Sequence, residues 1–202
     1  MAEEAIDNYL LWELCKREGI QKRISEGSLQ EELKQEIVEK VRREYREADY
    51  DRDEKIELLR ELDSNPDYRK TVFQNCSWRK ESVKIEKLGT TLPRFGGLPP
   101  EVISGNLPEV IEFVKNVDPD EYRSVGYIMS LKAYPEVLNE FLPSIVTPGD
   151  RESKRGRMNR VHGKKDWNIT DTWGMINDGN HRAIAQILAK DSEKIECYVG
   201  RR

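Results

Sequence analysis

One C-terminal stretch constrains the fold of this chain more than any other part of the sequence. Residues 173–177 (Trp-Gly-Met-Ile-Asn) predict a buried strand, and residues 178–180 (Asp-Gly-Asn) predict a tight turn. Residues 181–190 are strongly apolar and predict a helix, while residues 194–199 alternate like a second strand. A strand, a glycine turn, a helix and a strand in close succession indicate an α+β protein.

The first third of the chain predicts helices instead. Residues 3–16 place apolar side chains at helical spacing, and Gly19 is a plausible end for that helix. Ser28 and Glu31 have the spacing of a capping box, which predicts that a second helix begins there. A third helix should begin near Asp51 and end before Asn65-Pro66.

Each of these helices carries one apolar stripe, which it cannot bury alone. In the second helix we expect one face to be apolar and the opposite face to be exposed to water. The apolar face holds Leu33, Ile37, Val41 and Tyr45, and the exposed face holds Glu32, Lys34, Glu39 and Arg43. The stripes must pack on each other, on the rest of the chain or on a second copy. An intramolecular helical layer and a homodimer through the N-terminal helices both stay open.

The middle of the chain mixes short helices and strands. We expect a short helix over residues 67–76, a strand over 82–88 and another over 144–147. Pro108 and Asp118 mark helix starts, and residues 138–142 predict a final short helix. After the strand expected over 82–88, the Pro and Gly residues of 89–100 argue against regular structure. We therefore expect that segment to be a linker or a binding loop.

The positive charge is concentrated in one segment. The whole chain has a net charge of −4, yet residues 151–165 carry seven Lys and Arg against one Glu. The seven basic residues are Arg151, Lys154, Arg155, Arg157, Arg160, Lys164 and Lys165. Such a segment attracts phosphates or nucleic acid at long range, whereas the plain alternative is a solvated loop.

Composition excludes several classes of protein. No stretch approaches the roughly 20 apolar residues of a membrane-spanning helix, so we expect no membrane partner. The acidic N-terminus does not resemble a secretory signal, and three widely spaced cysteines form no disulfide framework or zinc finger. These features predict a cytoplasmic protein.

The turn at residues 178–182 contains the candidate functional side chains. A helix N-terminus offers backbone N–H groups and a positive dipole end, which suit an anion. Beside them, Arg182 could grip a phosphate, His181 could donate to it or move a proton, and Asp178 could orient His181 or hold a metal. The alternative is ordinary turn chemistry, with Asn180 as N-cap and Arg182 facing water.

Residues 176–185 (Ile-Asn-Asp-Gly-Asn-His-Arg-Ala-Ile-Ala), followed by 195–199, resemble the ParB/sulfiredoxin-like superfamily. Its members carry a Gly-x-His-Arg type signature between a strand and a helix, in a loop implicated in binding nucleotide phosphates. The resemblance implies that Gly179, His181 and Arg182 bind phosphate and that Asp178 is a nearby polar or metal-linked group. Sulfiredoxin has a reactive Cys where this chain has Asn180, so repair of sulfinic acids is not expected.

The resulting prediction is a helical region over residues 1–78 followed by a small ParB/sulfiredoxin-like mixed-sheet domain over 79–202. That domain holds a helical insertion at about 99–143 and the basic loop 151–165. We expect it to bind a nucleotide (ATP, ADP or CTP) with Mg²⁺, as a phosphotransferase or nucleotide hydrolase. His181 and Asp178 would be catalytic, Gly179, Asn180, His181 and Arg182 would bind phosphate, and Asp178 would be the metal ligand.

Two other functions stay open. One is a nucleic-acid-binding or nuclease-like module that uses the basic loop, and the other is a non-catalytic helical interaction protein. Among the lesser candidates, Asp166 and Asp171 could join Asp178 around Mg²⁺, and His162 is expected to be exposed. Cys197 is expected in the core, and for Trp167 and Trp173 we favour the core over stacking on a base.

Overall fold

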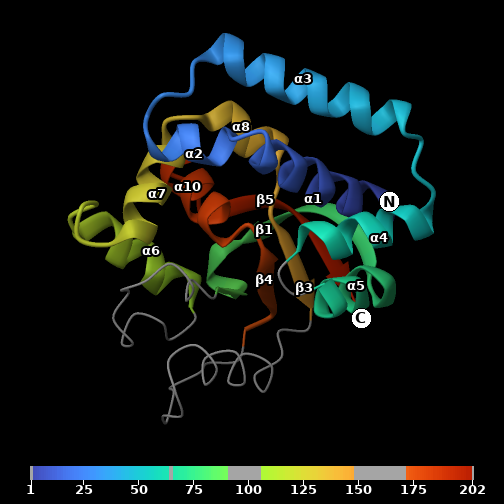
Figure 1. Cartoon of the computed structure of the whole chain (residues 1–202). Coiled ribbons are helices and arrows are strands. Elements are labelled where there is room, and N and C mark those ends of the chain that lie inside the picture. The colour runs from blue at the N-terminus through green and yellow to red at the C-terminus, as the bar shows by residue number, and fades with distance from the viewer. Residues whose placement is uncertain (1, 64–65, 91–105, 148–171, 202) are drawn as a thin grey trace. The chain divides into compact units, whose positions relative to one another are not determined.

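The computed structural model describes residues 2–63, 66–90, 106–147 and 172–201 (Figure 1). The chain divides into two compact units, Met1–Arg79 and Lys80–Arg202, where the sequence predicts a boundary after residue 78. The first unit is helical, and the second combines helices with most of a mixed five-stranded sheet. The protein therefore belongs to the α+β class, with an N-terminal helical region.

The first unit consists of helices that run consecutively along the chain: α1 (Ala2–Arg17), α2 (Ile20–Ser25), α3 (Glu31–Glu47), α4 (Arg52–Leu62) and α5 (Pro66–Asn75). Helix α1 is central, because α2, α3, α4 and α5 all contact it. The predicted start of the third helix is confirmed at Asp51. Its carboxylate accepts hydrogen bonds from the backbone N–H groups of Asp53 and Glu54, and the Glu54 carboxylate accepts one from the Asp51 N–H.

Hydrogen bonds between distant side chains hold this helical layer. The Tyr9 hydroxyl donates to Asp63 at 2.5 Å, which ties α1 to the end of α4. Asp7 accepts from the Tyr45 hydroxyl of α3 at 2.6 Å and pairs with Lys55 of α4 at 2.9 Å. Burial, followed by the hydrogen bond to Asp7, raises the pKa of Tyr45 far above its usual range, so this hydroxyl stays protonated.

The predicted cap at Ser28 is wrong. Helix α3 begins three residues later, at Glu31, with Gln30 as its N-cap. Ser28 belongs instead to the end of α2, where its backbone N–H donates to the Arg23 carbonyl and Gly27 donates to the Ile24 carbonyl. Gly27 has φ +62° and so supplies the left-handed residue that such a C-terminal motif requires.

The predicted exposed face of α3 is wrong at Lys34. Its side chain is buried, and its Nζ lies 2.7 Å from a carboxylate oxygen of Glu31. The buried stripe runs through Lys34, Ile37, Val38 and Val41, whereas Leu33 and Tyr45 are only half-buried. A lysine can line such a stripe because its four methylene groups pack as an apolar stem while its charge is paired.

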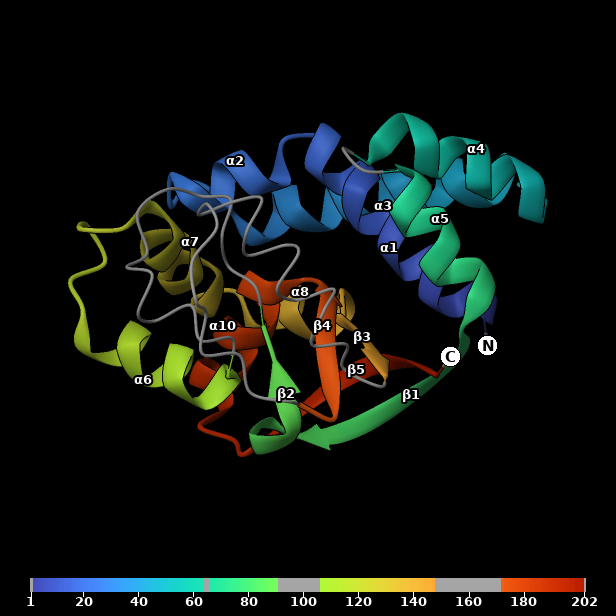
Figure 2. The same cartoon turned by 90° about the horizontal axis from the view of Figure 1, so that it is seen from below.

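The five-stranded sheet has the order β1-β5-β3-β4-β2, with β1 (Ser77–Lys84), β2 (Leu88–Gly89), β3 (Ser144–Thr147), β4 (Gly174–Asp178) and β5 (Lys194–Arg201). Strand β4 runs parallel to β2 and antiparallel to β3, while β3 and β5 are parallel (Figure 2). The strand predicted at 144–147 is confirmed, and β4 and β5 agree with the predicted strands within two residues at each end.

The remaining helices of the second unit are α6 (Leu107–Asn116), α7 (Arg123–Lys132), α8 (Pro135–Glu140) and α10 (Asn180–Lys190). Helix α10 contacts α7, α8 and β5 and buries Ala183, Ile184, Ala185 and Ile187. Cys197 is buried as expected, and burial raises the pKa of its thiol to about 12. Trp173 is not in the core, because 41% of it is exposed.

Two predicted boundaries in this unit are wrong for local reasons. The strand expected over 82–88 ends at Lys84, where a 3-10 turn (Ile85–Lys87) separates β1 from β2. The helix expected from Asp118 begins at Arg123, because Asp118 makes a turn instead. Its carboxylate accepts from the Asp120 N–H at 2.9 Å, and its carbonyl accepts from Glu121 at 3.0 Å.

Over the described parts of the chain, the structure contains no helix with the length and apolarity that a bilayer crossing requires.

Candidate functional site

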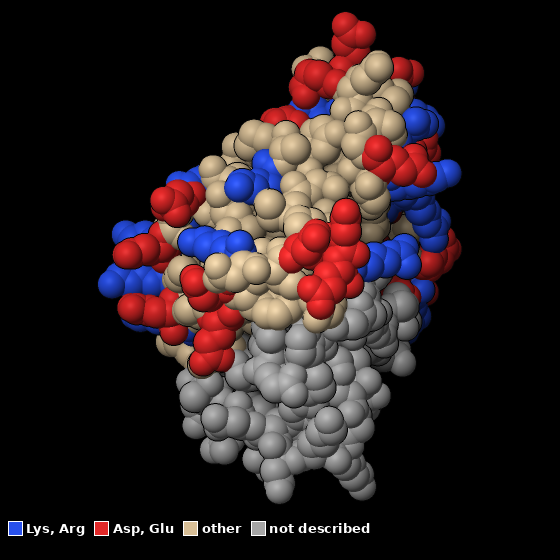
Figure 3. Space-filling view, turned by 90° about the vertical axis from the view of Figure 1, so that its left-hand side faces the viewer, with Lys and Arg blue, Asp and Glu red and all other residues tan. Residues whose placement is uncertain are grey.

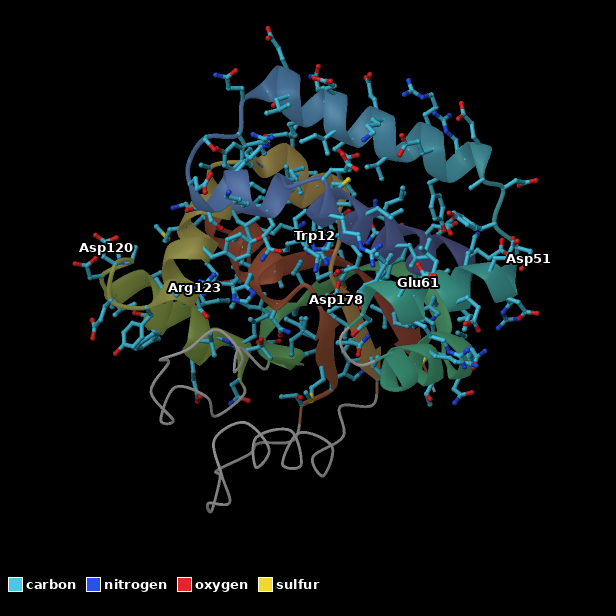
Figure 4. All side chains as sticks on the ribbon, in the orientation of Figure 1. Trp12, Asp51, Glu61, Asp120, Arg123 and Asp178 are labelled. Atoms are coloured by element: carbon cyan, nitrogen blue, oxygen red, sulfur yellow. The ribbon has the colours of Figure 1, made fainter. Side chains whose placement is uncertain are left out.

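The candidate site is the turn between β4 and α10. Asp178 is the last residue of β4, Gly179 follows it, and α10 begins at Asn180. Asp178 is labelled in Figure 4, where it lies among the strands of the second unit. Gly179 has φ +77°, a left-handed conformation that residues with a side chain rarely adopt.

Gly179 is also required by space. A Cβ atom there would lie 2.9 Å from Nη2 of Arg182 and 3.1 Å from Cα of Pro143. Both the backbone conformation and the neighbouring atoms therefore disfavour a side chain at residue 179. The turn can close this tightly only because residue 179 is a glycine.

Arg182 lies inside this turn. Only 2% of the residue is exposed, and its Nη2 pairs with Oδ2 of Asp178 at 2.5 Å. Its Nη1 donates to the backbone carbonyl of Phe141, after α8, at 3.0 Å. The guanidinium thus links the end of β4, the first turn of α10 and the chain after α8. Removing it would leave the largely buried Asp178 carboxylate without this cation.

Asn180 is the first residue of α10, and its side chain contacts a strand neighbour. The Thr90 hydroxyl donates a hydrogen bond to Oδ1 of Asn180 at 2.5 Å. Thr90 follows β2, which pairs in parallel with β4 through Leu88 opposite Gly174 and Gly89 opposite Met175. Parallel strands bring the residues after their carboxyl ends to the same edge, and this explains how residues 90 positions apart meet.

His181 follows in the first turn of α10 and is half-buried. Its ring lies 5.4 Å from that of Tyr127 on α7, in an edge-to-face arrangement. Burial, followed by the positive charge of Arg182, lowers the pKa of His181 to about 4, while the Asp178 carboxylate acts in the opposite direction. The imidazole is therefore neutral at pH 7, so it can donate one hydrogen bond or accept a proton but adds no positive charge.

The described residues do not form a metal site at this turn. Within residues 2–63, 66–90, 106–147 and 172–201, no group of three or more His, Cys, Asp or Glu side chains is placed to hold a metal ion. The Asp178 carboxylate is paired with Arg182, and Asp166 and Asp171 lie outside the described residues. The predicted Mg²⁺ ligand is thus engaged in an ion pair.

The basic segment 151–165 lies outside the described residues, as do His162 and Trp167, but the strands that lead to it are described. Strand β3 ends at Thr147 and β4 begins at Gly174, and the register pairs Val146 with Met175 and Ser144 with Asp178. The segment is therefore connected at the end of the β3–β4 pair opposite to Asp178. On the face in Figure 3, the described acidic and basic side chains are interspersed.

The five predicted site residues of the motif lie at the junction of β4 and α10, and the structure adds partners that the sequence did not suggest. Asp178 ends β4, Gly179 precedes α10, and Asn180, His181 and Arg182 form the first turn of that helix. Thr90, Tyr127 and the Phe141 carbonyl contact them from distant segments. Only the four-residue spacing of Asp178 and Arg182, which suits an ion pair across one helical turn, could have signalled their pairing.

Comparison of the chain with family models, with curated proteins and with solved structures finds no match. The resemblance of residues 176–185 to the ParB/sulfiredoxin-like superfamily stays a prediction.

Proposed function

We propose that the turn from Asp178 to Arg182 binds the phosphate group of a small ligand, most simply a nucleotide. The observation that carries this proposal is the left-handed Gly179 directly before α10, an 11-residue helix with no acidic side chain in its first turn. A helix N-terminus of this kind attracts anions through its dipole and its backbone N–H groups. The ParB/sulfiredoxin-like resemblance supports the same ligand class.

In this proposal the roles of Asp178 and Arg182 differ from those expected from the sequence. Arg182 and Asp178 hold the turn in shape, since each is committed to the other. Asn180 and His181 belong to the first turn of α10, whose backbone N–H groups would bind the phosphate. A neutral His181 can donate one hydrogen bond, and its lowered pKa makes it a weak base, so phosphotransfer and nucleotide hydrolysis are reactions to test after binding is established.

Calorimetric titration with ATP, ADP and CTP in the presence of Mg²⁺ tests the proposal. We expect saturable binding of at least one nucleotide, and weaker binding by Asn180→Asp, which places a negative charge at the first residue of α10. Asn139→Asp makes the same chemical change at an exposed position of α8 and is the matched control. If no nucleotide binds at millimolar concentration, or both variants bind like the original protein, the proposal is wrong.

Nucleic-acid binding is the second candidate, and the seven basic residues of the 151–165 segment favour it. Binding through these residues would weaken steeply with added salt, because each neutralised phosphate releases counterions. It would also be insensitive to Asn180→Asp. Measuring oligonucleotide affinity at several salt concentrations separates this function from binding at the turn.

A further inference from the structure

The Asp178–Gly179 peptide bond has a reactivity of its own, which is independent of the proposed phosphate site. It is the one Asp-Gly pair in the sequence, and the sequence contains no Asn-Gly pair. In an Asp-Gly pair the glycine has no side chain, so its backbone nitrogen is open to the aspartate carboxyl group. We propose that this bond is a latent site of isoaspartate formation, which the ion pair to Arg182 keeps unreactive in the folded protein.

The modification needs only these two residues and water. The Gly179 amide nitrogen loses its proton and bonds to Cγ of Asp178, and one carboxyl oxygen leaves as water, which gives a five-membered succinimide ring. Water then adds to one of the two ring carbonyls and breaks its bond to the nitrogen. Opening at the former main-chain carbonyl gives isoaspartate, in which the backbone runs through the side chain and is one carbon atom longer.

The closed turn prevents the first step by holding the carboxylate in place. Ring formation requires Cγ of Asp178 to swing onto the Gly179 nitrogen, but Oδ2 of Asp178 lies 2.5 Å from Nη2 of Arg182. The guanidinium cannot follow this movement freely, because Arg182 is only 2% exposed and its Nη1 donates to the Phe141 carbonyl at 3.0 Å. The ion pair thus restrains the one movement that ring closure needs.

Isoaspartate, once formed, does not fit the closed turn. A single Cβ atom at residue 179 would already lie 2.9 Å from Nη2 of Arg182 and 3.1 Å from Cα of Pro143. The extra backbone carbon of isoaspartate has to enter the same packed region, and the new carboxyl group is one carbon closer to the backbone than that of aspartate. A turn that has reacted therefore stays open and loses the Arg182 ion pair.

The test is to incubate the folded protein at neutral pH and to measure isoaspartate at residue 178. Protein isoaspartyl methyltransferase transfers a methyl group from S-adenosylmethionine to each isoaspartate, and mass spectrometry of the peptide that contains residue 178 locates it. The chain unfolded in guanidinium chloride gives the unprotected rate. We expect the folded protein to react at least about tenfold more slowly than the unfolded chain, because the buried ion pair must break first.

Two variants separate the ion pair from a general loosening of α10. Arg182→Met removes the cation that holds the Asp178 carboxylate. Gln186→Met is the matched control, since Gln186 is also 2% exposed and lies on the same helix. Its Nε2 donates to the Leu138 carbonyl at 3.2 Å, and its Oε1 accepts from the Glu196 N–H at 3.2 Å, so its loss loosens α10 without removing Arg182.

The rate of isoaspartate formation is compared with amide exchange in β4, which measures how often that strand opens. In Gln186→Met the two rates should rise by the same factor. In Arg182→Met isoaspartate formation should rise at least about tenfold more than exchange does, because the carboxylate is released while the strand stays paired. Thermal unfolding shows that each variant is folded.

Three results would overturn the proposal. The first is a folded original protein that forms isoaspartate at residue 178 as fast as the unfolded chain, and this comparison decides even if Arg182→Met does not fold. The second is an unfolded chain that forms no isoaspartate there. The third is a folded Arg182→Met in which isoaspartate formation rises no more than exchange in β4, as in Gln186→Met.

Discussion

Replacing Gly179 by alanine probes the geometry on which the site depends. Gly179 and Gly19 both have left-handed backbones, with φ of +77° and +88°. They differ in their surroundings, because a Cβ at Gly19 meets no atom within 4 Å, whereas one at Gly179 would lie 2.9 Å from Nη2 of Arg182. Gly19→Ala is therefore a matched control that carries the backbone strain without the steric clash.

The magnitudes follow from these two surroundings. An alanine in a left-handed conformation costs about 1 kcal/mol, which both variants should show. At Gly179 the added methyl group also overpacks the turn, at a cost of about 1–3 kcal/mol. If Arg182 moves away to relieve the clash, it weakens its pair with Asp178, and breaking such a buried pair costs about 3–5 kcal/mol. Gly179→Ala should thus destabilise its unit by at least about 2 kcal/mol.

Native-state hydrogen exchange measures this effect within each unit separately. Amides of β3, β4 and β5 should exchange faster in Gly179→Ala by at least about thirtyfold, the factor that 2 kcal/mol implies. Amides of α1 and α2 should change by about fivefold in Gly19→Ala. If the two variants open their own units equally, the tight packing of Arg182 against Gly179 does not constrain the turn, and the reasoning is refuted.

Three further predictions concern single side chains. Arg182→Met should destabilise the second unit by about 3 kcal/mol in urea unfolding. Adding Asp178→Asn should restore part of that loss, because it removes the unpaired carboxylate, and additive losses of stability in the double variant would contradict the ion pair. His181 should titrate at a pKa of about 4 in an NMR pH titration, and a pKa near 6.5 would contradict its burial. Its contribution to the free energy of unfolding should be complete above pH 6.5 and should fall as the pH drops toward 4, because the unfolded chain binds the proton at a higher pH than the folded chain. Asp51→Ala should cost about 1 kcal/mol in thermal unfolding of the first unit, whereas an unchanged midpoint would contradict the capping box.

Local patterns explain why parts of the fold could be predicted from the sequence. The alternation of residues 194–199 and the apolar run of 181–190 depend on near neighbours only, and β5 and α10 lie where these patterns place them. The Asp51 cap likewise needs no residue beyond Glu54. The predicted cap at Ser28 was wrong because its backbone N–H donates to the Arg23 carbonyl at the end of α2. The sequence does not show which of two adjacent helix ends such a residue belongs to.

The candidate site could be predicted in position but not in its internal arrangement. The sequence placed Gly179 at a turn before a helix, since glycine and the apolar run are both local signals. It could not show that the Arg182 guanidinium points inward, because one partner, the Phe141 carbonyl, is 41 residues away. The Thr90 contact spans 90 residues and depends on the parallel pairing of β2 with β4, which no local pattern indicates.

The most direct test of the phosphate site is a backbone NMR titration of the ¹⁵N-labelled protein with ATP, CTP and inorganic phosphate. We expect the amide signals of Asn180, His181 and Arg182 to shift saturably, since these residues form the first turn of α10. The shifts should be lost in Asn180→Asp and kept in Asn139→Asp. Saturable shifts confined to residues 151–165, or no shifts at millimolar ligand, would contradict binding at the turn.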